Sequence, residues 1–296
     1  MGRDSTGEES LMIVVGVDGS QGGLAAVIWA MREADLRGVK VRIVHVVPGW
    51  AYELPDDAPH AYVGRWMRQS AASVLADALR QARDERRGAE VESELLRGDP
   101  RLSLIRASKD ADLLVVGSHG LGGFGGLLLG SVALGVSGQA TCPVAVIRRT
   151  RTQPRNEVVV GVDGSPGGAA AIEFAFTEAG LRGADLRAVH AWSESAAGCR
   201  PEGTPARIHQ AGAERLLLAQ ALTGQSERRP GVKLVKHVER GHPVEVLLRV
   251  SAGAGLLVVG SRGRSAVAGL LLGSVSHSLL HHAACPLVVI AVADSA

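Results

Sequence analysis

The segment MIVVGVDGSQGG, at Met12–Gly23, recurs in the chain as VVVGVDGSPGG at Val158–Gly168. Four more pairs of segments repeat in the same order: ADLLVVGSHG and AGLLVVGSRG (Ala111–Gly120, Ala254–Gly263), LLLGSV (Leu127–Val132, Leu270–Val275), CPVAVI and CPLVVI (Cys142–Ile147, Cys285–Ile290), and RGDP and RGHP (Arg97–Pro100, Arg240–Pro243). Ordered self-similarity over about one domain length indicates two copies of one domain. We expect a first domain at residues 1–148, a second at residues 157–296, and a solvated connector at residues 149–156.

The composition of the chain is that of a globular protein. Its 296 residues are 46% hydrophobic and 21% charged, which is enough for two domains with apolar cores. The net charge of +2 gives no electrostatic reason to expect a nucleic-acid or membrane partner, and glycines break the longest apolar runs. Three cysteines and a charged first dozen residues favour neither a disulfide framework nor a signal peptide, so we expect a cytoplasmic protein.

Short apolar runs rich in Val, Ile and Leu alternate with longer helical patterns in each copy. This alternation is typical of βαβ units, and continuous apolar runs indicate strands that helices cover on both faces. In the first copy we expect strands at Leu11–Val17, Val39–Val47, Val91–Leu95, Leu113–Gly117 and Val144–Ile147. We expect its helices at Gly22–Arg37 and Arg65–Arg87, after Pro100, and from Gly130–Ser131. The predicted fold class is therefore α/β, with an open parallel sheet in each of the two tandem domains.

Two segments that follow strands carry the residues of a candidate site. The first, Gly16–Ser20, brings Asp18 to the carboxyl end of its strand, the side on which open α/β sheets bind ligands. The second runs from Gly117-Ser118-His119-Gly120, through nine residues, to Gly130-Ser131 at the start of a helix. The second copy keeps this spacing, from Gly260-Ser261-Arg262-Gly263 to Gly273-Ser274.

This pattern suits a phosphate group. Glycines without a Cβ let backbone N–H groups approach an anion, and a helix N-terminus adds N–H donors and a partial positive charge. Ser131 and Ser274 each add a hydroxyl donor. A single glycine-rich turn also has a purely conformational explanation, and the two copies share one ancestor, so their agreement counts once. The pattern favours a phosphate chain as the ligand.

The spacing Gly-x2-Gly-x9-Gly-Ser after LLVVG, with VGVDGS before it and CPV after it, resembles the universal stress protein family in its tandem form. The resemblance covers nearly the whole chain in both copies. It implies a five-stranded parallel sheet of order 3-2-1-4-5 in each domain and, in the subgroup with this motif, ATP binding. That order places the first and fourth strands on either side of the topological switch point, so the two candidate segments would face each other.

The resemblance also implies which residues contact the nucleotide. Asp18 and Asp163 would bind ribose hydroxyls or a phosphate-bound magnesium ion. Adenine would be flanked by Gly16, Val17 and Val46 in the first site and by Gly161, Val162 and Ala191 in the second. The glycine segments and first helical turns would hold ribose and phosphates: Gly117, Ser118, His119, Gly120, Gly130, Ser131 and Val132, and in the second copy Gly260, Ser261, Arg262, Gly263, Arg264, Gly273, Ser274 and Val275.

The two sites are expected to differ in charge. Between Gly117 and Ser131 the only ionisable side chain is His119, whereas the second copy offers Arg262 and Arg264, whose guanidinium groups suit phosphate oxygens. Arg262 lies inside the four-residue glycine turn and is the better candidate. We therefore expect the second domain to discriminate more sharply between ATP and AMP.

Metal and catalytic sites are less favoured. His277, His281, His282 and Cys285 lie close in sequence, but the first copy has Leu134, Gly138 and Gln139 at the matching histidine positions, so no metal site is expected. Buried thiols are expected at Cys142 and Cys285, and Cys199 is expected in a loop near Gly198 and Pro201. Arg262 replaces His119, so the two crevices share no acid–base pair, and the loop lacks a Walker A lysine. Binding is favoured over turnover.

The expected function is an ATP-binding regulatory module of the stress response, with one adenine nucleotide per domain. The alternatives are a slow ATPase or adenylate-transferring enzyme of the same fold, and a domain pair with degenerate sites. An uncovered apolar edge strand invites a partner. We therefore expect the last strands, Val144–Ile147 and Leu287–Val292, to pair across the two domains as an intramolecular pseudo-dimer; the resemblance implies the same edge, and a further homodimer is left open.

Overall fold

The structure is a computed structural model that describes residues 11–55, 57–58, 60–85, 88–120, 129–148, 153–193, 205–263 and 272–291. The first half of the chain alternates strands and helices in the order β1 (Met12–Val17), α1 (Gln21–Arg37), β2 (Lys40–Val47), α2 (Trp50–Glu53), α3 (Ala61–Asp84), β3 (Val91–Arg97), α4 (Pro100–Ala107), a 3-10 turn η1 (Ser108–Asp110), β4 (Leu113–Gly117), α5 (Ser131–Gln139) and β5 (Val144–Ile147). Apart from the short α2 and η1, these are the predicted elements.

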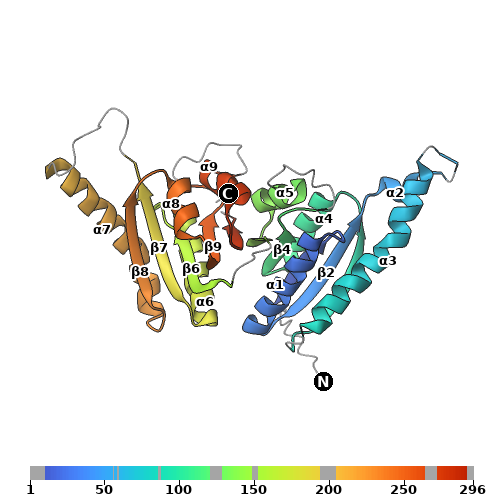
Figure 1. Ribbon diagram of the computed structural model, residues 1–296, viewed down its shortest axis with the longest axis horizontal. Coiled ribbons are helices and arrows are strands. Elements are labelled where there is room, and N and C mark those ends of the chain that lie inside the picture. Colours follow the sequence, from blue (N-terminus) through green and yellow to red (C-terminus); the bar gives the residue numbers. More distant parts are fainter. Residues whose placement is uncertain are drawn as a thin grey trace, which may run out of the picture.

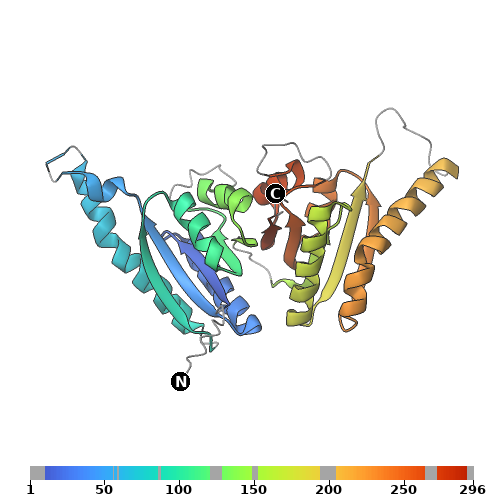
Figure 2. The ribbon, with the colours of Figure 1, turned by 180° about the vertical axis from the view of Figure 1, so that it is seen from behind.

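The second half repeats this order. Its elements are β6 (Arg155–Gly161), α6 (Pro166–Arg182), β7 (Asp185–Trp192), α7 (Pro205–Arg228), β8 (Leu234–Arg240), α8 (Pro243–Val250), β9 (Ala254–Gly260), α9 (Ser274–His282) and β10 (Leu287–Ile290). Figures 1 and 2 show the two halves from opposite sides, joined at the centre of the molecule, with α3 and α7 at its two ends.

Within the described residues, ten strands form one sheet of order β3-β2-β1-β4-β5-β10-β9-β6-β7-β8. Neighbouring strands within each half are parallel, so the predicted order 3-2-1-4-5 is confirmed in both halves. At the centre β5 and β10 pair antiparallel, with Ala145 opposite Val288. The last strands therefore pair across the halves, as the sequence predicts.

Helices cover both faces of the sheet, which explains the continuous apolar strands. One core cluster joins alternate strand residues such as Ile13 and Val15 to α1, α3, α6 and α7. The other joins the intervening residues, such as Val14, to α4, α5, α8 and α9. Residues of the central strands are thus buried whichever way they point.

Several predicted boundaries and one predicted strand face differ in the structure. The outer strand β3 is not apolar on both faces: the side chains of Glu92 and Glu94 are 43% and 47% exposed, because β3 is an edge strand. Helix α3 begins at Ala61, four residues before the predicted start at Arg65. Strand β6 begins at Arg155, so two residues of the expected connector belong to a strand.

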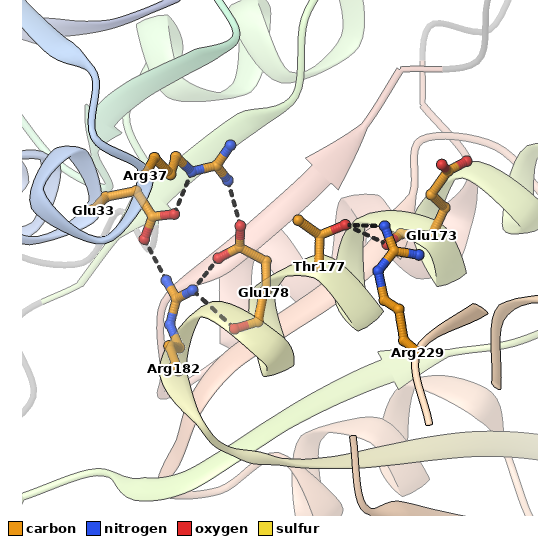
Figure 3. Close-up of polar contacts among 7 residues, drawn as sticks. All are labelled: Glu33, Arg37, Glu173, Thr177, Glu178, Arg182 and Arg229. Carbon is orange, nitrogen blue, oxygen red and sulfur yellow. Dashed lines mark hydrogen bonds and ion pairs between the residues drawn. The ribbon is translucent and has the colours of Figure 1, made fainter. Parts of the chain in front are cut away.

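The junction of the halves also contains a ring of four charged side chains, which we call the α1–α6 ring (Figure 3). Glu33 and Arg37 lie one turn apart on α1, and Glu178 and Arg182 lie one turn apart on α6. Each arginine pairs with the glutamate of its own helix and with that of the other helix. The Glu33 and Glu178 side chains are 1% and 0% exposed, whereas those of Arg37 and Arg182 are 16% and 17% exposed. The two carboxylates are therefore buried, and the two guanidinium groups keep partial access to water.

The α1–α6 ring predicts a pH dependence of stability. Burial, and next the charge of Glu33, raise the pKa of Glu178 to about 7 from its ordinary 4.5. The folded chain thus binds this proton more tightly than the unfolded chain, so the stabilising contribution is complete below pH about 4.5 and is lost as pH rises through about 7.

The measurement is urea unfolding between pH 4.5 and 8. We expect the free energy of unfolding of the parent, relative to Glu178→Gln, to fall by about 3 kcal/mol across this range. Glu173→Gln is the matched control, because Glu173 is an exposed glutamate of the same helix. A difference between parent and Glu178→Gln that stays constant with pH would contradict the shift.

Candidate functional site

The candidate site lies where β1 and β4 end side by side in the sheet. The chain leaves β1 toward α1 on one face and leaves β4 toward α5 on the other face. Neighbouring parallel strands whose connections diverge in this way leave a crevice at their carboxyl ends. The second half has the same arrangement at β6 and β9.

Asp18 and the glycine turn after β4 face each other directly. A Cβ added at Gly120 would lie 2.3 Å from Oδ2 of Asp18, and a Cβ added at Gly263 would lie 2.6 Å from Oδ2 of Asp163. Only glycine permits this approach, because a real Cβ does not come so close to an oxygen. The structure therefore brings together the two segments that the sequence singled out, in both halves.

The other carboxylate oxygen of each aspartate holds its own turn. Oδ1 of Asp18 accepts a hydrogen bond from the Ser20 N–H at 3.0 Å, and Oδ1 of Asp163 accepts from Ser165 N–H at 2.9 Å. The Ser20 hydroxyl in turn caps α1 by accepting from the Gly23 N–H at 3.1 Å. Each aspartate is thus fixed by one oxygen, while the other faces the glycine turn.

Gly22 packs against the candidate site, and the sequence analysis did not include it among the site residues. A Cβ at Gly117 would lie 2.6 Å from the Gly22 carbonyl carbon, and a Cβ at Gly22 would lie 2.5 Å from the carbonyl oxygen of His119. The first turn of α1 therefore rests on the glycine turn with no room for side chains. The glycine pair that ends the repeated DGSxGG segment was the available signal.

Gly130 and Gly273 begin α5 and α9 as N-caps without a side-chain cap. Their N–H groups donate to the carbonyl oxygens of Ser118 and Ser261, both at 2.8 Å, which ties each helix start to the glycine turn. Ser131 and Ser274, in the first turns, are exposed. The first-turn N–H groups of each helix thus point toward the turn that faces the aspartate.

Ser118 and Ser261, which the resemblance places in the two sites, are almost fully buried in the structure. They are 5% and 4% exposed, and their N–H groups donate to the carbonyl oxygens of Ile147 and Ile290. The Ser118 hydroxyl also lies 2.9 Å from Nδ1 of His119. These serines connect the glycine turn to the last strand of the same half.

The residues expected around adenine are largely core residues. A Cβ at Gly16 would lie 2.9 Å from Leu104, and one at Gly161 would lie 3.2 Å from Leu247, so these glycines make room for α4 and α8. The remaining side chains lie in or against the two core clusters: Val17, Val46, Val162 and Ala191. The geometry leaves mainly their backbone atoms for contact with a ligand.

The two halves differ at one position beside the helix start. A Cβ at Gly130 would lie 3.7 Å from the His119 Cα, and a Cβ at Gly273 would lie 3.5 Å from the Arg262 Cα. His119 and Arg262 therefore occupy matching places in the two crevices. Arg264 lies outside the described residues.

The histidines of α9 do not form a recognisable metal site. The ring centroids of His277 and His281 are 4.9 Å apart, but within the described ranges no three His, Cys, Asp or Glu side chains group as metal ligands.

Burial raises the pKa of the Cys285 thiol to about 11 and that of the Cys142 thiol to about 12. Cys199 lies outside the described residues. None of the described helices is long and apolar enough to cross a bilayer.

The chain is similar to known proteins over most of its length. The family model of the universal stress protein family matches twice, at residues 12–148 and 154–291. A universal stress protein of Mycobacterium tuberculosis is 39% identical over 293 residues, which cover 96% of this chain and 98% of that protein. A universal stress protein structure from Archaeoglobus fulgidus has a TM-score of 0.70 and 23% identity, and covers 97% of this chain and 98% of its own.

A shorter solved structure, of a universal stress protein in complex with cAMP, matches 47% of this chain and 96% of its own, with 28% identity and a TM-score of 0.34. The double family match and the full-length relative agree with the repeat, the sheet order and the glycine turns described above. The chain belongs to the universal stress protein family, in its tandem form.

Proposed function

We propose that each half of the chain binds one adenine nucleotide, ATP, in the crevice between its aspartate and its glycine turn. The observation that carries the proposal is the close approach of Asp18 Oδ2 to Gly120, repeated by Asp163 and Gly263. In each half, a carboxylate that can accept a hydrogen bond from a hydroxyl or coordinate a cation lies beside a glycine turn and beside a helix N-terminus without a side-chain cap. The carboxylate suits the ribose hydroxyls, and the glycine turn and the helix N-terminus suit the phosphates.

The phosphates would lie at the starts of α5 and α9. A helix N-terminus offers N–H donors and a partial positive charge, and glycine N-caps leave room for phosphate oxygens beside them. The exposed hydroxyls of Ser131 and Ser274 supply one further donor in each half. A magnesium ion held on the phosphates would take Asp18 or Asp163 as a ligand, since carboxylate oxygens suit that ion.

We assign the chain a regulatory role in the cytoplasm rather than a catalytic one, with nucleotide occupancy as the signal. His119 and Arg262 stand at matching places, so the two crevices share no histidine that could form an acid–base pair with the aspartate. The second candidate remains a slow ATPase or adenylate-transferring enzyme, because a magnesium-bound phosphate chain is also the substrate of such reactions. Nucleotide turnover by the parent that disappears when both sites are blocked would favour it.

Replacing Gly130 by Glu is expected to weaken ATP binding in the first half by about 100-fold, because a carboxylate at the helix start repels phosphate. The fold has room for a side chain there, since the nearest atom to an added Cβ is the Ser118 carbonyl oxygen at 3.4 Å. Gly273→Glu is the corresponding change in the second half. Titration calorimetry with ATP measures both.

Gly130→Gln is the control for this prediction, because it has the same length without the charge. We expect the Gln variant to keep most of the affinity. Equal loss in the Gln and Glu variants would show that space, and not phosphate repulsion, is responsible. Unchanged ATP affinity in the double Glu variant, with circular dichroism intact, would contradict the phosphate assignment.

The second half is expected to prefer ATP over AMP more strongly than the first. Arg262 stands where the first half has His119, and a guanidinium group binds the added phosphates of ATP. Arg262→Ala should narrow the difference in binding free energy between ATP and AMP by about 1–3 kcal/mol. The Gly130→Glu and Gly273→Glu proteins isolate the two sites, and equal ATP-to-AMP ratios in them would refute the asymmetry.

A further inference from the structure

In each half, a histidine side chain hydrogen-bonds to the backbone carbonyl group just before the aspartate. His45, on β2, places Nδ1 2.8 Å from the carbonyl oxygen of Val17, the last residue of β1. His190, on β7, places Nδ1 2.7 Å from the carbonyl oxygen of Val162. A carbonyl oxygen can only accept, so Nδ1 carries the proton and donates in both halves.

This hydrogen bond acts on the peptide that leads directly into the aspartate. The Val162 N–H donates to the carbonyl oxygen of Val189 at 2.9 Å, which is the last backbone bond along this edge of β6. The next hydrogen bond comes from the His190 ring to the Val162 carbonyl oxygen, and it fixes the plane of the peptide between Val162 and Asp163. Asp163 begins its turn from that plane, with Oδ1 on the Ser165 N–H and Oδ2 toward Gly263.

The second half holds its histidine more firmly than the first. Nε2 of His190 lies 2.8 Å from Oε2 of Glu214 on α7, and His190 is 2% exposed. His45 is less buried, and Gln69 and Ser70 on α3 stand near the place in sequence that corresponds to Glu214. The ring of His190 is thus fixed at both nitrogens by two different elements.

We propose that His190, through its Nδ1 bond to Val162, is a positioning residue that aims Asp163 at the nucleotide, and that His45 has the same role for Asp18. This inference rests on the proposed function, because it assigns a task to a residue behind the proposed site. The histidine does not touch the ligand. It sets the direction of the aspartate, and Glu214 sets the direction of the histidine in the second half.

Two substitutions separate the two ring nitrogens. The amide nitrogen of Asn reaches the place of Nδ1, so His190→Asn keeps a donor for the Val162 carbonyl and loses the contact with Glu214. The longer Gln reaches the place of Nε2, so His190→Gln does the reverse. Both substitutions are made in the Gly130→Glu protein, so that the measured ATP binding comes from the second site.

The first readout needs no nucleotide. It is the hydrogen exchange of the Ser165 amide, whose proton Asp163 holds. We expect the Asn variant to exchange like the parent and the Gln variant to exchange about tenfold faster. The second readout is ATP affinity by calorimetry, with the Asn variant within about threefold of the parent and the Gln variant about tenfold weaker. Thermal unfolding of both variants accompanies these measurements.

The proposal is overturned if the Asn and Gln variants behave alike in both readouts, or if the Asn variant is the weaker one. If the parent binds no ATP, the proposed function fails at this site while the exchange of Ser165 still decides the role of His190. If the buried position tolerates neither change, the same pair at His45, in the Gly273→Glu protein, must give the same order at the Ser20 amide, whose proton Asp18 holds.

Discussion

Exchanging Glu33 and Arg37, as Glu33→Arg with Arg37→Glu, is expected to lower the free energy of unfolding by about 3–5 kcal/mol. The exchanged pair still forms its bridge within α1. Across the junction, however, the new arginine at position 33 meets Arg182 and the new glutamate at position 37 meets Glu178. Two like-charge contacts replace two ion pairs, and in each contact one of the two positions is fully buried in the parent.

The same exchange in α6, as Glu178→Arg with Arg182→Glu, is the matched partner of this experiment. Alone it should destabilise by a similar amount, and together the two exchanges should restore most of the stability, because every cross pair is again of opposite charge. Urea unfolding of the four proteins gives the coupling between the helices. Additive losses in the combined protein would contradict the idea that α1 and α6 are joined by this ring.

The second large effect is expected at Gly117. An added Cβ would lie 2.6 Å and 2.7 Å from the carbonyl carbon and oxygen of Gly22, both backbone atoms that no rotamer change can move. Gly117→Ala must therefore push α1 away from β4, and we expect a loss of about 3 kcal/mol in the free energy of unfolding. Because α1 also carries the Ser20 cap beside Asp18, the first site should lose ATP affinity as well.

Gly212→Ala is the control for this prediction. Gly212 lies in α7, and an added Cβ meets no atom within 4 Å, so alanine should stabilise by about 0.5–1 kcal/mol through its helix propensity. The two alanine variants should thus move thermal unfolding in opposite directions. A Gly117→Ala protein as stable as the parent would show that α1 and β4 are not packed as closely as described.

The repeat and the apolar runs predicted the two domains, their α/β class and the place of most strands, while the strand order was implied by the family resemblance. Strands β4 and β5 lie at the predicted residues. Both are buried on both faces of the sheet, so their sequences are continuous apolar runs that are easy to recognise. The edge strand β3 differs, since the segment VESELLR contains four polar residues and is only partly buried. The pairing of β5 with β10 across the two halves was predictable because an uncovered apolar edge strand invites a partner and because the family resemblance implies the same edge.

The residues of the candidate site could be predicted from the sequence, but the side-chain contacts that hold them in place could not. Asp18 and Gly120 could be paired from sequence, because both follow strands that the sheet order brings together. The bond from His45 to Val17 could not, since a lone histidine in a strand gives no sign of where its nitrogens point. The α1–α6 ring was hidden for the same reason: an i,i+4 pair of opposite charges usually lies on a solvated helix face.

The most direct test of the account is the number of ATP molecules bound per chain. The full-length protein is freed of bound nucleotide, and the nucleotide content is checked by mass spectrometry before titration calorimetry with ATP and magnesium. The account predicts one ATP for each half of the chain, one for the single Gly130→Glu or Gly273→Glu variant, and none for the double variant. No binding by the parent, or a single site that both variants leave intact, would contradict it.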